Sequence, residues 1–208
     1  MRALLLIDIQ NDFMPGGALA VPDGDAVVPV ADALMPKFSL VIATQDWHPA
    51  DHGSFAVNHP GNVPGDIIEL GGVPQVLWPA HCVQDTPGAS FHPDLDVAGI
   101  DDVVRKGTDP AVDSYSGFFD NARRHATGLD EYLKARDVDE LVVAGLATDY
   151  CVRATCLDGV DLGYAVTLVE DGCRAVNLAP DDGELAIEQM RLAGVAIARS
   201  SDILASAG

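Results

Sequence analysis

The sequence predicts an α/β fold in which a parallel sheet is covered by helices on both faces. Three observations support this prediction. Short apolar runs without polar alternation recur along the chain, which is typical of strands that are buried on both faces. Amphipathic helical patterns separate several of these runs, and turn residues bound them. A strand followed by a helix, repeated along the chain, indicates a doubly wound sheet.

Six apolar runs are the predicted strands, over residues 3–7, 40–43, 103–104, 141–144, 165–169 and 195–198. Helices are predicted over residues 25–36, 128–136, 150–162 and 181–193. Pro29 interrupts the first helical pattern, which weakens it. The last pattern follows Pro180 and ends before Gly194, a residue typical of helix termination.

Length, composition and charge limit what the protein can do. A chain of 208 residues with 48% apolar residues is expected to form one domain, over residues 1–208. Its net charge of −20 argues against binding to nucleic acid or to an anionic membrane. The apolar run before Asp8 is too short for a signal peptide, and no run has the length of a transmembrane helix. We therefore expect a cytoplasmic protein whose four cysteines are thiols.

Residues 46–99 break the alternation of strands and helices. This loop-rich region contains both tryptophans and many glycines and prolines, and histidines are concentrated in it. Long loops in a compact domain are usually functional or disordered, and the aromatic and histidine content favours function. Ligands of open α/β sheets bind beyond the carboxyl ends of the strands. Five candidate residues follow or end predicted strands and should meet there: Asp8, Asp46, His48, Lys106 and Cys151.

Cys151 is the candidate nucleophile, because it lies between a predicted strand and the start of a predicted helix. A helix N-terminus favours a thiolate, and its free N–H groups can form an oxyanion hole. The alternative is a buried core cysteine, which is our interpretation of Cys156 and Cys173. Position alone does not decide between these two interpretations of Cys151.

Asp8 and Lys106 strengthen the catalytic interpretation. An ionisable side chain at the end of the apolar strand 3–7 is costly unless it has a partner or a role. Asp8 could take the thiol proton and later donate it to a leaving amine, or it could simply cap the next turn. Lys106 could keep Asp8 ionised and stabilise developing charge, or it could be a solvated strand end.

A metal site is predicted after the second strand. Asp46 and His48 are two residues apart in an extended segment, so they face the same side. A carboxylate and an imidazole are common metal ligands, and His81 could supply a third. A solvent-exposed pair is the alternative for this short motif. His52 and His59 are alternative ligands that spacing does not rank against His81.

Six segments resemble, in order, the motifs of the cysteine hydrolases of the isochorismatase-like superfamily, and its nicotinamidase branch most closely. They cover residues 5–13, 46–49, 78–83, 105–107, 115–118 and 145–152. The resemblance extends across nearly the whole chain. It implies a three-layer α-β-α fold with a six-stranded parallel sheet, the Rossmann-like fold of isochorismatase-like hydrolases.

The resemblance also implies roles for individual residues. Asp8, Lys106 and Cys151 match the catalytic triad of the superfamily. The family has a cis peptide bond before the position of Ala147, and the N–H groups of Ala147 and Cys151 form its oxyanion hole. The substrate pocket is implied to contain Phe13, Trp78, Tyr115 and Leu146. Tyr150 stands where some relatives have histidine.

One divalent metal ion is implied on Asp46, His48 and His81, with zinc as the first candidate before iron and manganese. Some relatives use a fourth protein ligand near the position of His52, whereas others have water there. The implied reaction is hydrolysis of nicotinamide to nicotinate and ammonia through a cysteine thioester, which serves NAD salvage. Pyrazinamide is a second candidate substrate, and the resemblance leaves a homodimer open.

Three other functions are alternatives to this prediction. The first is another hydrolase of the superfamily, acting on an N-carbamoyl compound or on isochorismate; those branches generally lack the metal ligands. The second is a non-catalytic binding domain, which the joint presence of Asp8, Lys106 and Cys151 argues against. The third is a metallohydrolase in which Cys151 takes no part, which alkylation of that residue would reveal.

Overall fold

A six-stranded parallel sheet forms the middle layer of the protein. The computed structural model describes residues 1–205, so the last three residues of the predicted domain lie outside it. The strand order is β5-β2-β1-β6-β7-β8. These strands are β1 (Arg2–Ile7), β2 (Val41–Asp46), β5 (Asp102–Lys106), β6 (Glu140–Leu146), β7 (Ala165–Arg174) and β8 (Ala196–Ala198). Each overlaps a predicted strand, so the predicted α/β fold with a six-stranded parallel sheet is confirmed.

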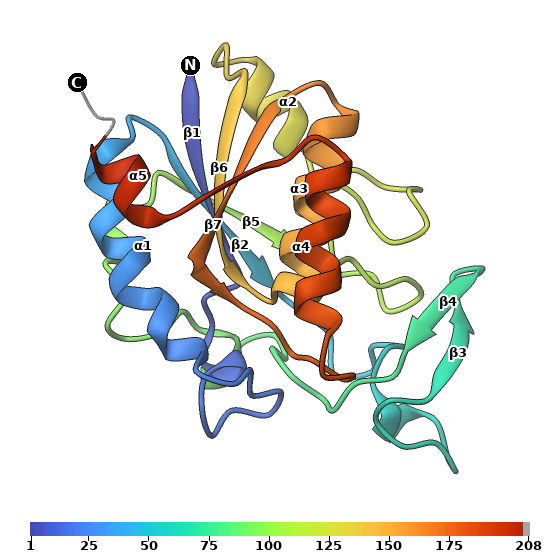
Figure 1. Cartoon of the computed structure of the whole chain (residues 1–208). Coiled ribbons are helices and arrows are strands. Elements are labelled where there is room, and N and C mark those ends of the chain that lie inside the picture. Colours follow the sequence, from blue (N-terminus) through green and yellow to red (C-terminus); the bar gives the residue numbers. More distant parts are fainter. Residues whose placement is uncertain (206–208) are drawn as a thin grey trace.

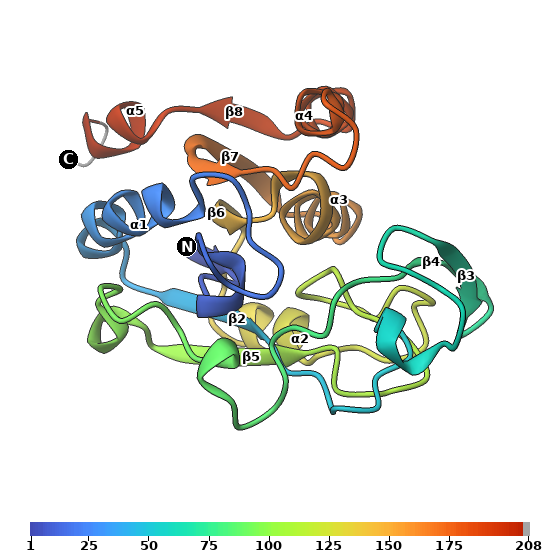
Figure 2. The same cartoon turned by 90° about the horizontal axis from the view of Figure 1, so that it is seen from below.

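Helices cover both faces of this sheet (Figures 1 and 2). On one face lie α1 (Val28–Leu34) and α5 (Ser200–Ala205), and on the other lie α2 (Leu129–Lys134), α3 (Arg153–Asp161) and α4 (Asp182–Leu192). Pro29 is in the first turn of α1, where its missing N–H group does not break a helical hydrogen bond. Helix α5 was not predicted. Within residues 1–205, no helix combines the length and apolarity needed to cross a membrane.

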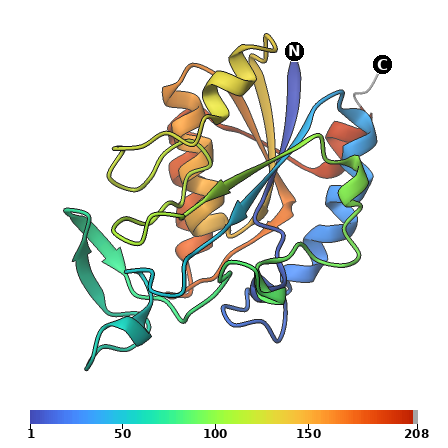
Figure 3. The same ribbon diagram turned by 180° about the vertical axis from the view of Figure 1, so that it is seen from behind.

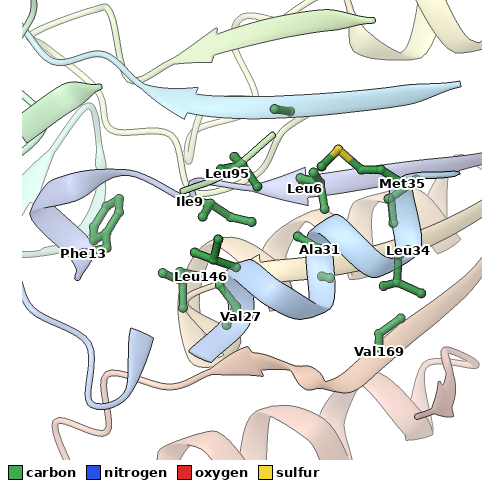
Figure 4. Packing of buried hydrophobic residues seen from close by; sticks show 14 of the residues in the cluster. Leu6, Ile9, Phe13, Val27, Ala31, Leu34, Met35, Leu95, Leu146 and Val169 are labelled. Carbon is green, nitrogen blue, oxygen red and sulfur yellow. The ribbon is translucent and has the colours of Figure 1, made fainter. Parts of the chain in front are cut away.

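The central strand β1 packs apolar side chains against the layers on both of its faces. Leu4 and Leu6 pack on the side of α1, whereas Ala3, Leu5 and Ile7 pack on the opposite side. Figure 4 shows Leu6 beside the α1 residues Ala31 and Leu34. Full burial of one such leucine contributes about 1.5–3 kcal/mol. A strand that is anchored on both faces gives the residue at its carboxyl end a fixed position.

An antiparallel hairpin lies outside the main sheet. It consists of β3 (Ile67–Leu70) and β4 (Val73–Val76), and it projects away from the sheet (Figure 3). Gly71 and Gly72 form its turn, both with positive φ angles, 61° and 83°. The hairpin was not predicted, although two glycines between short apolar runs are a recognised hairpin signal.

The chain after β6 has an irregular path. The peptide bond between Leu146 and Ala147 is cis, as the resemblance implied. A π-helical turn, Thr148–Val152, follows, and only then does α3 begin. Cys151 therefore lies in this turn rather than in a regular α-helix.

Candidate active site

The three candidate catalytic residues meet at the carboxyl edge of the sheet. Asp8 directly follows β1, Lys106 is the last residue of β5, and Cys151 lies in the turn after β6. Their exposed fractions are 0%, 2% and 6%. Because the strands are parallel, their carboxyl ends bring together residues that are far apart in the sequence.

Lys106 is at the centre of this group. Its Nζ lies 2.8 Å from Asp8 Oδ2 and 3.3 Å from Cys151 Sγ. It also donates to the Ser114 carbonyl oxygen at 3.1 Å and makes a short ion pair with Asp46 Oδ1. A buried ammonium group with these partners stays charged, and its pKa is raised against the effect of burial by Asp46 and Asp8. Lys106 therefore supplies a fixed positive charge beside the thiol.

Asp8 is suited to accept a proton near neutral pH. Burial raises the pKa of its carboxyl group to about 6, although the neighbouring Lys106 acts in the opposite direction. Thr44 Oγ1 donates to Asp8 Oδ1 at 2.7 Å and fixes the orientation of the carboxylate. This geometry explains the ionisable residue at the end of an apolar strand, because Asp8 is paired and hydrogen-bonded there.

The thiol of Cys151 is protonated in this environment. Burial raises its pKa well above the ordinary value, Asp8 and Asp46 act in the same direction, and Lys106 opposes them. The lowering of the pKa expected from a helix N-terminus is therefore outweighed. A thiol in this state needs a base before it can attack a substrate.

A second group of side chains lies beside the first. Asp46 ends β2, His48 follows it, and His81 comes from the loop after β4. Asp46 Oδ2 is 3.6 Å from His48 Nε2 and 3.9 Å from His81 Nε2. The other oxygen of Asp46 pairs with Lys106, so this carboxylate joins the two groups. Lys106 and His48 hold the pKa of Asp46 well below its usual range, although burial opposes this.

The hydrogen bonds of the two histidines leave the same ring nitrogen free. His48 Nδ1 donates to the Gly107 carbonyl oxygen, and His81 Nδ1 donates to the Pro79 carbonyl oxygen, both at 2.8 Å. A carbonyl oxygen can only accept, so Nδ1 carries a proton in both rings and Nε2 faces Asp46. Burial acts to lower the pKa of His48, but the neighbouring Asp46 outweighs it and raises this pKa. Burial lowers the pKa of His81 to about 4, which keeps it neutral. This donor set fits a divalent metal ion.

Gly107 packs closely against His48, one of the candidate metal ligands. Its φ angle is 64°, and a Cβ atom at this position would overlap the His48 imidazole ring. Glycine is therefore required for the carbonyl group to reach His48 Nδ1.

His52 supports the same interpretation, whereas His59 does not. The side chain of His52 is buried, and its Nδ1 lies 2.7 Å from Ser54 Oγ. Its Nε2 has no hydrogen-bond partner among the described residues. The His52 ring lies 4.4 Å from the His48 ring, and His52 belongs with His48 and Asp113 to a second group of possible metal ligands beside the first. His59 Nε2 instead bonds to the Gly53 carbonyl oxygen at 2.7 Å.

Most of the predicted substrate-binding residues line a pocket beside Cys151. Phe13, Trp78 and Tyr115 line it, and Ala147 and Cys151 form part of its wall. Leu146 was also expected there, but its side chain is buried in the apolar core (Figure 4). The reason is that Leu146 still belongs to β6, whereas the chain turns into the site only after it.

The sequence left open which way Tyr150 faces, and several other residues of the site were missed. Tyr150 lines the pocket, and its ring packs edge-on against the Trp78 ring at 4.8 Å. Leu19, Asp113 and Val176 also line it, and no motif pointed to them. Thr44 could have been noticed, because it is a polar residue inside a buried strand and such residues need a partner.

Comparisons with known proteins agree with this geometry. The Isochorismatase domain family matches residues 2–202. The nicotinamidase of Escherichia coli (strain K12) is 52% identical over 205 residues, which cover 97% of this chain and 96% of that protein. A solved Acinetobacter baumanii nicotinamidase/pyrazinamidase is 44% identical, with a TM-score of 0.94 and coverage of 97% of both chains. A Pyrococcus horikoshii pyrazinamidase, solved in complex with zinc, is 38% identical, with a TM-score of 0.77 and coverage of 95% of this chain and 98% of that chain.

The family match, the sequence identity and the fold extend over nearly the whole chain, and a buried cysteine, lysine and aspartate meet beside the pocket. The protein therefore belongs to the isochorismatase family.

Proposed function

We infer that this chain is a nicotinamidase, an amidohydrolase that converts nicotinamide to nicotinate and ammonia. The observation that carries the mechanism is the position of Lys106 Nζ, 3.3 Å from Cys151 Sγ and 2.8 Å from Asp8 Oδ2, beside an aromatic pocket. The full-length similarity to nicotinamidases supports the substrate.

The proposed reaction begins with proton transfer from the Cys151 thiol to Asp8. The raised pKa of Asp8, about 6, makes this carboxylate a base that is active near neutral pH. The thiolate then attacks the carboxamide carbon. Lys106 stabilises the thiolate as it forms, because its charge lies next to the sulfur atom.

We propose that the backbone N–H groups of Ala147 and Cys151 bind the oxyanion of the tetrahedral intermediate. Both residues line the pocket at the turn that follows β6. Asp8 then donates its proton to the amide nitrogen of this intermediate, the C–N bond breaks, ammonia leaves, and a thioester remains on Cys151. Removal of one oxyanion donor typically raises the barrier by about 2.7–4 kcal/mol.

Water completes the proposed cycle. Asp8 is ionised again after ammonia leaves, and it can accept a proton from the water molecule that attacks the thioester. Cys151 leaves as a thiolate and takes back the proton that Asp8 holds, and the acid product loses a proton to give nicotinate.

We propose that Asp46, His48 and His81 hold one divalent metal ion, with His52 as a fourth ligand. The free Nε2 atoms of the histidines and the acidic partner support this assignment. Zinc is the first candidate, before iron and manganese, since a homologous pyrazinamidase was crystallised with it. When bound, the ion would supply a Lewis-acid centre for the pyridine nitrogen and so orient the ring.

The proposal extends to the domain organisation and to a second substrate. We propose that residues 1–208 form one hydrolase domain, because the family match spans residues 2–202. Pyrazinamide is proposed as a second substrate, because a homologue is described as a pyrazinamidase. A cytoplasmic location and a homodimer stay predictions.

The decisive experiment is an assay of ammonia release from nicotinamide by the reduced, metal-loaded protein. Cys151→Ala is the control, and mass spectrometry of rapidly quenched wild-type protein should find a nicotinoyl group on the Cys151 peptide. Turnover of nicotinamide that the control lacks supports both substrate and nucleophile. If the wild-type protein hydrolyses an N-carbamoyl compound but not nicotinamide, the substrate assignment is wrong and the nucleophile stands.

A further inference from the structure

A buried glutamine in the β3–β4 hairpin joins several parts of the pocket. Gln75 is 1% exposed, and glutamine is seldom buried to this extent without hydrogen bonds. Its Nε2 lies 2.7 Å from the Val76 carbonyl oxygen, 3.0 Å from Asp113 Oδ2 and 2.9 Å from the Tyr115 hydroxyl. Its Oε1 accepts a hydrogen bond from Asn121 Nδ2 at 3.2 Å.

Two of these partners belong to the pocket wall. Asp113 and Tyr115 line the pocket, as does Trp78. Trp78 Nε1 donates to the same Tyr115 hydroxyl oxygen, at 3.1 Å. This oxygen therefore lies between Gln75 on one side and the Trp78 indole on the other.

Tyr150 extends the same arrangement. Its ring packs edge-on against Trp78 at 4.8 Å and against Tyr115 at 5.4 Å. The three rings pack against each other. Tyr115 is linked to the hairpin directly by the hydrogen bond from Gln75, and Trp78 is linked indirectly, through the Tyr115 hydroxyl. Gln75 is the hairpin residue that makes this link.

We propose that Gln75 is a positioning residue for substrate binding, which fixes Tyr115 and, through the Tyr115 hydroxyl, Trp78. Through Gln75, strand β4 then supports the wall of the substrate pocket, although it lies outside the catalytic sheet. This inference rests on the proposed function, because it concerns binding of the nicotinamide ring.

The arrangement predicts which kinetic constant Gln75 controls. The pocket wall contacts the nicotinamide ring in the ground state and in the transition state. Displacement of the wall therefore weakens binding of the substrate and binding of the transition state equally. Such a loss raises KM and leaves kcat nearly unchanged. A residue that mattered only for folding would change the amount of active protein instead.

The test uses Gln75→Met, which keeps the length of the side chain and removes both polar atoms. We expect KM for nicotinamide to rise about tenfold, as for the loss of a buried hydrogen-bond set, while kcat changes less than about threefold. The matched control is Ile67→Thr in the paired strand, whose side chain is 70% exposed. This control should keep wild-type kinetics.

Nuclear magnetic resonance provides a readout without turnover. The chain has two tryptophans, so its ¹H–¹⁵N spectrum should contain two indole N–H signals, and Trp78→Phe identifies the one from Trp78. In Gln75→Met the Trp78 signal should shift and its proton should exchange faster with solvent. The Trp47 signal should stay in place.

A second variant changes Asn121, which donates a hydrogen bond to Gln75. Asn121→Asp keeps an acceptor for the Tyr115 backbone N–H group but replaces the donor to Gln75 with a second acceptor. We expect a smaller rise in KM in the same direction. In the double variant, the effects of Asn121→Asp and Gln75→Met should not add, because both remove the same link.

A Gln75→Met protein with wild-type KM and an unchanged Trp78 signal would overturn the proposal, as would a fall in kcat at constant KM. If Gln75→Met does not fold, the KM and the Trp78 indole signal of Asn121→Asp test the proposal instead. Failure of the proposed function would appear separately, as wild-type protein that releases no ammonia from nicotinamide. In that case, the Trp78 indole signal of Gln75→Met would still show whether Gln75 positions Trp78.

Discussion

The two halves of the active site are built on different supports. Asp8, Lys106 and Cys151 lie at or just after the ends of buried strands. The pocket wall and the histidines proposed to bind metal instead come from loops, where side-chain hydrogen bonds to carbonyl and hydroxyl groups fix their positions. The difference indicates that the reacting groups depend on the core, whereas substrate recognition depends on a network of polar contacts that can be altered locally.

Asp46 is the exception that connects these halves. One of its oxygens pairs with Lys106, and the other faces His48 and His81. The comparison therefore predicts that changes at the strand ends act on kcat, changes in the loops act on metal or substrate binding, and changes at Asp46 act on both.

The largest effect is expected for Cys151→Ala. Loss of the nucleophile should reduce kcat by about 10⁴-fold or more, because no thioester can form. The melting temperature should change little, since the substitution removes one sulfur atom. Ammonia release and thermal unfolding provide the measurements.

The matched control is Cys156→Ala, which removes another buried thiol, in α3, away from Lys106. That variant should keep its activity. Near-normal turnover by Cys151→Ala would contradict the covalent mechanism.

Asp8→Asn should lower kcat/KM by about 10²–10⁴-fold, because the amide cannot accept the thiol proton. The wild-type enzyme should show the corresponding pH dependence. Asp8 becomes protonated below its pKa of about 6, so kcat/KM should fall about tenfold per pH unit below this value. A profile that stays flat down to pH 5 would show that Asp8 is not the base.

Thr44→Val sharpens this test. The Thr44 hydroxyl donates to Asp8 and lowers the pKa of that carboxyl group. Its removal favours the protonated form, so the acidic limb of the pH profile should move to higher pH. A limb that moves to lower pH, or stays in place, would contradict this role of Thr44.

Among the loop residues, His81→Ala should have the largest effect. It removes a proposed metal ligand, so affinity for zinc should fall by more than about 100-fold, with weaker binding of nicotinate as a consequence. His52→Ala should lower zinc affinity less, since His48 and Asp46 remain with His81.

Metal content after dialysis against a chelator, and calorimetry with zinc, measure these changes. His59→Ala is the control, because its ring bonds to a backbone carbonyl group outside the cluster. Equal loss of zinc in His59→Ala would show that the effect arises from disturbance of the loop. A smaller effect than loss of a metal ligand is the tenfold change in KM expected for Gln75→Met, which acts on substrate recognition and leaves kcat nearly unchanged.

The same contrast explains what the sequence could predict. The strand-end residues became candidates through local patterns, since Asp8 follows five apolar residues and Cys151 lies between a predicted strand and a predicted helix. For Cys151 this pattern alone did not decide between a nucleophile and a core thiol. The assignment of His81 as a ligand and of Trp78 and Tyr115 as pocket residues depended on the resemblance. Spacing alone did not rank His81 above His52 or His59, since loop geometry is set by distant contacts.

Gln75 had no local signal at all. Its sequence neighbours suggest an exposed hairpin strand, and its burial arises only when the segment carrying Asp113, Tyr115 and Asn121 packs against it. Leu146 shows the opposite error, because a residue next to the site in sequence lies in the core. Tertiary contacts decided both cases.

The close approach of Gly107 to His48 affects how this protein tolerates variation. Gly107 has no side chain and takes no part in the reaction, yet it follows Lys106 directly and contacts a metal-binding histidine. A mutational scan scored on activity should therefore rank Gly107 among the most sensitive positions, next to residues that perform chemistry. Libraries for directed evolution should keep it fixed and place their diversity at exposed positions of the segment that precedes β3, such as Val57 and Val63.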